Sequence, residues 1–118
     1  MKGGDIMADI NEVKKDVVKR GIEILGDKIF KIILFGSYAR GDFEQDSDVD
    51  IMVLLDCSRV DLPKYRKLLS VVSSDTSLDN NVTVSLMVND KDTFYEKMNI
   101  LPFYQNIQKD GVVLYEQC

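Results

Sequence analysis

The first strong pattern in the chain is helical. Between Ile10 and Leu25, apolar residues recur every three or four positions, with lysines and glutamates on the remaining positions. Asp9 precedes this stretch and Gly26 follows it, and both are residue types favoured at helix ends. The stretch therefore predicts a helix that packs one face on a core, and that face is expected to hold Ile10, Val13, Val17, Gly21 and Ile24.

Three later stretches have the patterns of strands. Residues 29–35 and 49–55 are almost continuously apolar, which is typical of strands buried on both faces. Residues 82–88 instead alternate valine and leucine with threonine, serine and methionine. The sequence therefore predicts a sheet of at least three strands.

The rest of the chain predicts further helices around this sheet. Residues 62–72 read as an amphipathic helix with a proline in its first turn, and the polar run 73–81 as a linker. Asn89 or Asp90 is expected to cap a short helix carrying Phe94, Tyr95 and Met98. A helix over 102–109 should turn Phe103 and Ile107 inward, before an edge strand at 112–115. The order of elements predicts an α/β or α+β fold, a small mixed sheet flanked by helices.

Length and composition are those of one compact globular domain spanning residues 1–118. The 118 residues are 45% hydrophobic and 30% charged, and residues 1–8 are expected to be a disordered leader. No apolar run is long enough to cross a membrane and no signal peptide is recognisable, so a cytoplasmic location is expected. The net charge of −5 disfavours a general nucleic-acid-binding surface.

The residue types present exclude several kinds of chemistry. Histidine is absent, and the only cysteines, Cys57 and Cys118, have no metal-site spacing. Zinc sites of the usual kind and Ser-His or Cys-His nucleophiles are therefore excluded. Any catalysis has to use carboxylates, hydroxyls, basic side chains and a hard cation.

Residues 36–50 hold such a set of groups. Gly36 and Ser37 end the first apolar run at the start of a short helical turn, where free backbone N–H groups suit a phosphate. Asp48 and Asp50 open the second run, and strand alternation places them on one face with Cα atoms roughly 6–7 Å apart. Two carboxylates at that spacing suit a hydrated divalent cation, so this stretch predicts phosphoryl or nucleotidyl transfer.

Each of these residues also has a plainer interpretation. Ser37 can cap the short helix, with or without a phosphate. Arg40 can steady phosphates or form a surface ion pair with Asp42 or Asp46. The two aspartates can be ordinary strand-entry residues, but like charges that close are costly without a cation.

Gly36-Ser37, ten intervening residues and Asp48-x-Asp50 resemble the signature of the DNA polymerase beta-like nucleotidyltransferase superfamily. The inner segment GSYARG is most similar to its minimal, single-domain members. The resemblance implies a polymerase beta-like fold in which Gly36, Ser37 and Arg40 bind the nucleotide. It also implies that Asp48 and Asp50 are catalytic and hold one or two Mg²⁺ ions. The reaction implied is transfer of a nucleoside monophosphate, AMP from ATP by default, to a hydroxyl of a protein or small molecule.

The sequence departs from this family at one position. A third carboxylate usually comes from a neighbouring strand, and here the matching position is Ser85, with Thr83 on the same face. Three hypotheses follow: an active transferase, a degenerate nucleotide-binding regulatory subunit, or a polymerase fragment acting on nucleic acid. The resemblance also implies a partner, because minimal members often work beside a helical HEPN-type protein as the antitoxin of a toxin–antitoxin pair. The acidic composition ranks the nucleic-acid hypothesis last.

Overall fold

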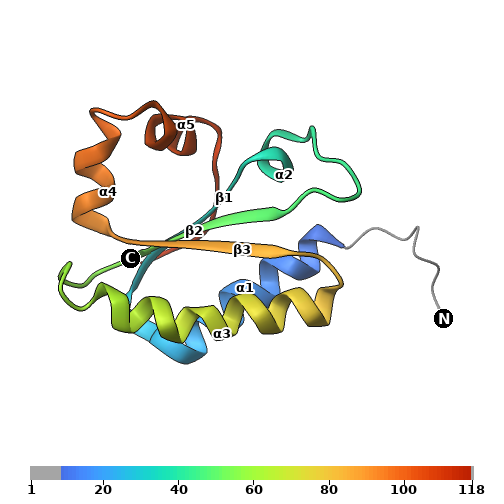
Figure 1. Ribbon diagram of the computed structural model, residues 1–118, viewed down its shortest axis with the longest axis horizontal. Helices are drawn as coiled ribbons and strands as arrows, with labels where there is room; N and C mark the ends of the chain where they lie inside the picture. Colours follow the sequence, from blue (N-terminus) through green and yellow to red (C-terminus); the bar gives the residue numbers. More distant parts are fainter. Residues whose placement is uncertain (1–8, 118) are drawn as a thin grey trace.

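The computed structural model describes residues 9–117, in which a four-stranded sheet lies between two layers of helices (Figure 1). The expected leader, residues 1–8, lies outside the described residues. The elements in chain order are α1 (Ile10–Leu25), η1 (Gly26–Lys28), β1 (Ile29–Phe35), α2 (Ser37–Arg40), β2 (Val49–Leu55), α3 (Leu62–Asn80), β3 (Val84–Asp90), α4 (Lys91–Met98), α5 (Pro102–Asp110) and β4 (Val112–Glu116). The predicted mixed sheet flanked by helices is confirmed.

The strand order is β3-β2-β1-β4, so the two most apolar strands are the central ones. β1 pairs antiparallel with β2 and with β4, whereas β2 and β3 run parallel. β1 and β2 have the predicted bounds, and side chains on both of their faces are buried, as continuous apolar runs require. The predicted edge strand near the end of the chain is also present, as β4.

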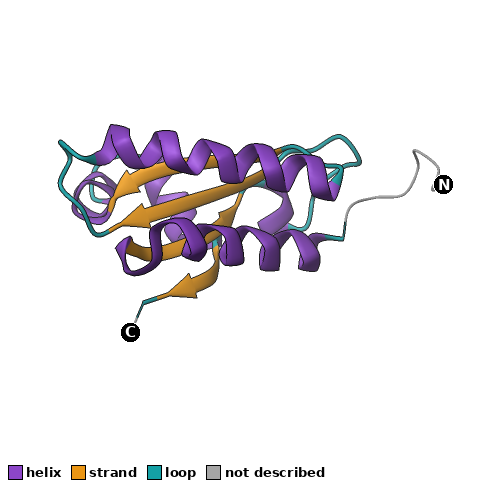
Figure 2. Cartoon of the chain, turned by 90° about the horizontal axis from the view of Figure 1, so that it is seen from below, coloured by secondary structure: helices purple, strands orange, loops and turns teal. Residues whose placement is uncertain are grey.

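Each face of the sheet is covered by a different pair of helices (Figure 1), and Figure 2 looks onto the face that α1 and α3 cover. On one face, Val13 and Val17 of α1 and Leu69 and Val72 of α3 pack against β1, β2 and β3. On the other face, the smaller cluster contains Phe94 of α4 and Ile107 of α5. None of the described helices is both long and apolar enough to cross a membrane.

The helix α1 has the predicted ends but a slightly different buried face. The Asp9 carboxylate accepts a hydrogen bond from the Asn11 N–H, and Gly26 ends the helix at φ 52°. Ile24, predicted to face the core, is exposed, and Leu25 is buried instead. The buried positions from Val17 onward follow an i+4 spacing, which rotates Ile24 away from the sheet.

The polar run 73–81 is not a linker, and this prediction was wrong. α3 continues to Asn80, and Asn81 ends it in the left-handed conformation. The hydroxyl groups that favour loops in isolation are used inside the helix: the buried Thr76 donates to the Val72 carbonyl at 2.6 Å. Tertiary contacts therefore override the low helix propensity of this segment.

Two details near the end of the chain also differ from expectation. β3 spans Val84–Asp90 rather than 82–88, although the alternation is as predicted, because Val84 and Val88 are buried. Asp90 caps α4 as expected, accepting a hydrogen bond from the Thr93 N–H. Phe103, predicted to point inward, is 44% exposed. Its ring packs edge-on against Phe35 and leaves one side open.

Candidate nucleotide site

Gly36 lies immediately beside Asp50. Phe35, the last residue of β1, is the register partner of Asp50 in β2, so the chain turns away from the sheet next to that carboxylate. Gly36 has φ 76°, and a β-carbon built on it would lie 2.5 Å from Asp50 Oδ2. Both the backbone conformation and the contact require glycine here. The close approach leaves backbone, rather than a side chain, lining the space beside the carboxylate.

Ser37 begins α2 directly after this turn. The hydrogen bonds of this short helix start with the Ala39 N–H, which donates to the Gly36 carbonyl at 3.1 Å. The N–H groups of Ser37 and Tyr38 therefore precede the first bonded turn, where amides have no intrahelical acceptor. The Tyr38 ring is buried and stacks on Phe43 with a centroid separation of 4.2 Å, which fixes α2 against its loop.

Asp50 and Asp48 are electrostatic neighbours. Burial raises the pKa of the Asp50 carboxyl, the negative charge of Asp48 raises it further, and Arg40 acts in the opposite direction. Asp48 precedes β2 and is exposed. That both carboxylates contact a single cation stays a prediction. The negative charge of Asp48 close to Asp50 is consistent with a position that a cation would occupy.

Arg40 forms one of the two ion pairs that the sequence left open, and its contact with a phosphate stays a prediction. Its Nε lies 3.3 Å from Asp42 Oδ2, and both side chains are about half exposed, so this ion pair contributes little to stability. The Arg40 side chain also lines the same cavity as Asp50 and lowers the pKa of that residue. An arginine held loosely at a cavity wall can turn its guanidinium toward a phosphate.

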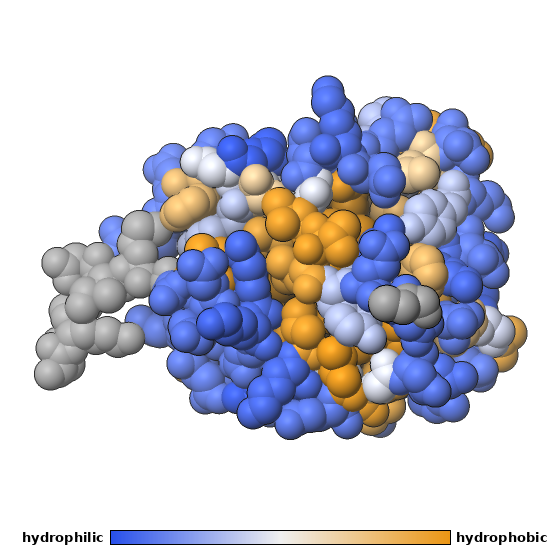
Figure 3. All heavy atoms as spheres, turned by 180° about the vertical axis from the view of Figure 1, so that it is seen from behind, coloured by the Kyte–Doolittle hydropathy of each residue, from blue (hydrophilic) through white to orange (hydrophobic). Residues whose placement is uncertain are grey.

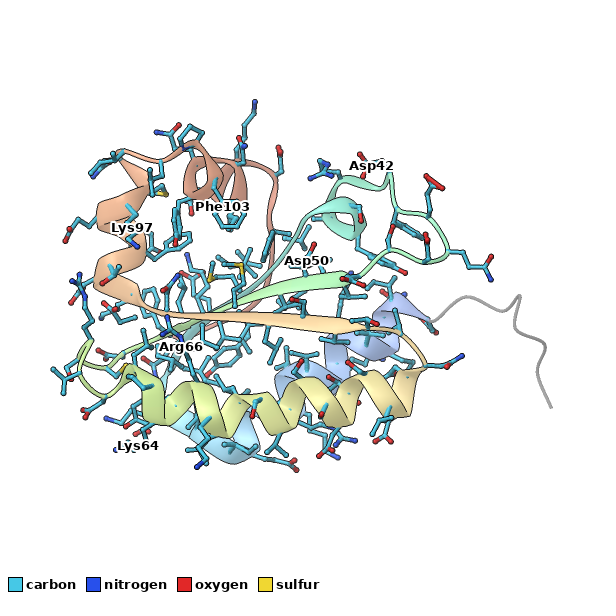
Figure 4. The ribbon with its side chains drawn as sticks, viewed as in Figure 1. Asp42, Asp50, Lys64, Arg66, Lys97 and Phe103 are labelled. Atoms are coloured by element: carbon cyan, nitrogen blue, oxygen red, sulfur yellow. The ribbon has the colours of Figure 1, made fainter. Side chains whose placement is uncertain are left out.

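A cavity of about 400 Å³ joins these residues to α5 (Figure 4). One wall consists of Gly36, Ser37, Arg40 and Asp50, and the opposite wall of Phe103, Asn106, Ile107 and Asp110. The residues from α5 follow an i, i+3, i+4, i+7 spacing and so share one helical face. Sequence reasoning missed Asn106 and Asp110. The amphipathic pattern of 102–110 was visible, but nothing in it indicated that this face meets residues 36–50.

Ser85 occupies the position beside Asp50. In the parallel pair of β2 and β3, Asp50 and Ser85 are register partners, so their side chains leave the sheet on the same face. Thr83 lies just before β3, and its carbonyl accepts a hydrogen bond from the Val49 N–H. A third carboxylate at this place on β3 is therefore absent, and Asp90 cannot replace it because it caps α4 at the far end of the strand.

The donor set fits a magnesium ion brought in with phosphates. Within residues 9–117, no group of three or more His, Cys, Asp or Glu side chains is placed to hold a metal. Mg²⁺, however, is commonly bound by one or two carboxylates, with water and substrate phosphates completing its coordination. Asp48 and Asp50 would supply those two carboxylates, and Ser37, at the start of α2, lines the same cavity as Asp50. A metal site formed by protein groups alone is not expected.

A larger groove, of about 820 Å³, lies along α3 and β3. Serine hydroxyls and apolar side chains make up most of its lining, together with Arg66 and Lys97. It contains no carboxylate, thiol or imidazole, and two of its serines already bond the main chain of β3. The smaller cavity is the better candidate for chemistry because it alone contains Asp50 and the start of α2.

Comparisons with known proteins identify relatives of this chain. The family model described as a nucleotidyltransferase domain matches residues 10–114. The candidate protein adenylyltransferase MJ0141 of Methanocaldococcus jannaschii is 32% identical over 108 residues, which is 92% of this chain and 97% of that protein. A second candidate protein adenylyltransferase of the same organism, MJ0604, is 38% identical over 88 residues, covering 75% of this chain and 80% of that protein.

Solved structures share the fold at low sequence identity. A candidate nucleotidyltransferase from Sulfolobus solfataricus superposes with a TM-score of 0.53 at 19% identity, covering 98% of this chain and 94% of that one. A chain from the complex of the tri-AMPylated Shewanella oneidensis HEPN toxin with its MNT antitoxin gives a TM-score of 0.53 at 16% identity, covering 91% of this chain and 72% of that one. At these identities the likeness concerns the fold, which is the polymerase beta-like nucleotidyltransferase fold.

Proposed function

The chain belongs to the nucleotidyltransferase family, as a minimal nucleotidyltransferase domain, and on that basis we propose that it transfers AMP from ATP to a hydroxyl group of a protein. The observation that carries the proposal is the single cavity in which Asp50, Gly36, Ser37 and Arg40 converge. Two archaeal relatives carry the name of candidate protein adenylyltransferases, which favours ATP as the donor and a protein as the acceptor.

In the proposed complex, the phosphates lie at the start of α2. The amides of Ser37 and Tyr38 and the Ser37 hydroxyl donate to phosphate oxygens, and Gly36 lets the phosphates approach closely. Arg40 adds positive charge on the same wall. Mg²⁺ bound by Asp48 and Asp50 would neutralise charge on the α-phosphate and on the departing pyrophosphate.

The opposite wall is assigned to the nucleoside and the acceptor. Phe103 offers an exposed ring face for stacking of the base, and Asn106 offers an amide for hydrogen bonds. Asp110 lies two helical turns further along α5, roughly 10 Å from Phe103 at 1.5 Å per residue. At that distance the Asp110 carboxylate would not contact a nucleobase stacked on Phe103, and it can face the acceptor.

The proposed transfer exchanges one bond to the α-phosphorus for another. The acceptor oxygen forms a bond to the α-phosphorus, and the bond from that phosphorus to the bridging oxygen of pyrophosphate breaks. The proton of the attacking hydroxyl passes to Asp110, since the residue beside Asp50 is a serine and cannot accept it as a carboxylate would. The products are an adenylylated acceptor and pyrophosphate.

The register pair of Asp50 and Ser85 favours a second candidate function. A site with two carboxylates can bind Mg²⁺-ATP without turning it over. In that case the chain is a nucleotide-binding regulatory subunit of a helical partner. The fold is shared with an MNT antitoxin bound to a HEPN toxin, and a HEPN-type protein is the partner we propose for either function.

The deciding experiment is label transfer from ATP carrying a labelled α-phosphate, with Mg²⁺, in a lysate of the source cells. The transferase proposal expects label on a discrete protein, lost with Asp50→Asn and kept with Asp56→Asn. Asp56 is a matched control because it lies beyond the other end of β2, paired with Lys91. ATP binding without label in the wild type indicates the regulatory function. Label that persists with Asp50→Asn overturns the proposed site.

A further inference from the structure

The two edges of the sheet differ in how many of their main-chain groups are hydrogen-bonded by side chains. At the β3 edge, side chains of α3 bond main-chain groups of Val84 and Val88. The Ser77 hydroxyl accepts from the Val84 N–H at 2.9 Å, and the Ser73 hydroxyl donates to the Val84 carbonyl at 2.7 Å. Arg66 donates through Nε and Nη2 to the Val88 carbonyl. An added strand would have to displace these contacts, so strand addition at the β3 edge is disfavoured.

The β4 edge has no such cover. In the part of the chain that the structure describes, no side chain hydrogen-bonds the main chain of Val112–Glu116. The side chains of Val112 and Val113 are 41% and 49% exposed, and exposed apolar side chains on an edge strand favour pairing with another chain. Figure 3, which views the side of the molecule opposite to Figure 1, shows apolar side chains gathered in a band between hydrophilic borders. This edge is open and apolar.

Positive charge borders the open edge. A groove of about 460 Å³ is lined by Val112, Val113 and Leu114 from β4 and by Lys14, Lys15, Val18 and Lys19 from α1. Among residues 9–117, none of these three lysines forms an ion pair. Arg20 on the same helix differs, because it is paired with Asp16, Asp75 and Asp79. Lys15 and Lys19 also lie near Asp16, but that carboxylate is already engaged by Arg20 and Asn80.

We propose that β4 binds an extended segment of a partner protein, which adds a fifth strand to the sheet. On the face away from α1 its apolar side chains would cover Val113, and on the α1 face its carboxylates would pair with Lys14, Lys15 and Lys19. Strand addition to an exposed edge gains main-chain hydrogen bonds, while side chains set specificity. The unpaired lysines specify an acidic segment.

The same lysines argue against a second copy of this chain as the occupant. Two β4 strands paired antiparallel are related by a two-fold axis perpendicular to the sheet, so both α1 helices lie on the same face beside the seam. The two groups of lysines would then face each other across the interface. Like charges placed this way cost free energy, so pairing with an acidic segment is favoured.

The proposal is tested with two fluorescent nine-residue peptides and the full chain. Both alternate valine with a charged residue, glutamate in one and lysine in the other. Fluorescence anisotropy is expected to show binding of the glutamate peptide at least tenfold tighter than of the lysine peptide. Amide hydrogen exchange should slow at 112–116 in the complex and remain unchanged at 84–90.

Two variants separate strand addition from general attraction. Val113→Asp is expected to weaken the glutamate peptide at least tenfold, whereas Val71→Asp, at a similarly exposed valine on α3 (52%), should leave it unchanged. Replacing Lys14, Lys15 and Lys19 by glutamate should reverse the preference between the peptides. Binding without protection of 112–116, equal binding of both peptides, or concentration-dependent dimerisation that protects 112–116 would each overturn the proposal.

Discussion

Asp50 on β2 and Ser85 on β3 are register partners in the parallel pair of strands, and this pairing places a serine beside Asp50 where the proposed metal site would need a third carboxylate. Ser85→Asp is therefore expected to tighten Mg²⁺ binding and to raise label transfer from ATP. Without divalent ions, the added like charge should destabilise the fold by up to about 1 kcal/mol. Thermal unfolding with and without Mg²⁺ measures the loss of stability and the stabilisation by Mg²⁺, and the labelled-ATP assay measures transfer.

Ser85→Asn is the matched control, because it has the shape of aspartate without its charge. The stabilisation by Mg²⁺ should appear with aspartate and not with asparagine. Equal behaviour of the two variants would show that position 85 does not face the metal.

Gly36 is expected to be irreplaceable. A β-carbon at this position would lie 2.5 Å from Asp50 Oδ2, and the positive φ disfavours any side chain. Gly36→Ala should cost about 1–3 kcal/mol of unfolding free energy and should also abolish Mg²⁺-ATP binding, because Asp50 has to move. Chemical denaturation and isothermal titration calorimetry give the two quantities.

Gly26→Ala separates the cost of a side chain at positive φ from the effect of the contact with Asp50. Gly26 also has a positive φ, but no atom lies within 4 Å of an added β-carbon. This variant should lose stability and retain ATP binding. If it lost ATP binding as fully as Gly36→Ala, the contact with Asp50 would not be the reason.

Phe103 is expected to contribute to nucleotide affinity. Its ring is held edge-on by Phe35 and lines the cavity opposite Arg40. Stacking of a base on an aromatic ring is worth about 1–3 kcal/mol, so Phe103→Ala should raise the Kd for Mg²⁺-ATP about tenfold or more. Leu101→Ala is the control, since Leu101 is similarly exposed but lies outside the cavity lining. Equal effects of the two variants would contradict a stacking role.

Asp110 should affect transfer without affecting binding. If its carboxylate accepts the proton of the attacking hydroxyl, Asp110→Asn lowers the rate of label transfer about a hundredfold or more. The Kd for Mg²⁺-ATP should stay within about twofold of the wild type, whereas Asp50→Asn should raise it, a contrast that titration calorimetry can resolve. A full transfer rate in Asp110→Asn would remove this residue from the mechanism.

Asp90 stabilises the start of α4 in a pH-dependent way. Burial raises the pKa of Asp90, but hydrogen bonds from Thr93 and the charge of Arg59 outweigh it and bring the pKa below its ordinary value of 3.8. A lowered carboxyl pKa stabilises the fold above the pKa of the unfolded chain, and this stabilisation is lost as the pH falls through the folded value. Asp90→Ala should cost about 1–2 kcal/mol at neutral pH.

The cost of Asp90→Ala should begin to shrink as the pH falls below 3.8, the ordinary pKa of the carboxyl, and should be lost as the pH falls through the lower pKa of the folded state. Denaturant unfolding across pH 2.5–7 follows this change, with Asp92→Ala as a control in the same helical turn. A cost that does not vary with pH would mean that the carboxylate charge is not what stabilises α4.

The sequence was sufficient where local pattern decides structure. The apolar runs of β1 and β2 were enough to predict the bounds of these strands, and the turn at Gly36 and Ser37 lies beside Asp50. That this turn binds a phosphate, and that Asp48 and Asp50 bind a metal, stay predictions. The second half of α3 was missed because Thr76 and the nearby serines favour loops by propensity, and only contacts with distant residues keep them helical. Arg20, for example, reaches Asp75 and Asp79 from α1.

The wall of the cavity formed by α5 was missed for a similar reason. Asn106 and Asp110 lie more than fifty positions after Asp50 in the chain. The hydrophobic periodicity of a helix does not predict which end of which strand the helix packs against. The exposed ring of Phe103 was mistaken for a core residue because its spacing from Ile107 is that of a buried helical face. Ile107 is buried, and Phe103, one turn earlier, lies at the rim.

The partly covered β3 edge bears on how large an assembly of this protein can become. A sheet that is open at both edges can act as a template for stacking without limit, as in fibrils. Here Ser73, Ser77 and Arg66 already bond the main chain of β3, so strand addition is favoured at β4. We therefore expect complexes to form at one edge of the sheet rather than growth in both directions.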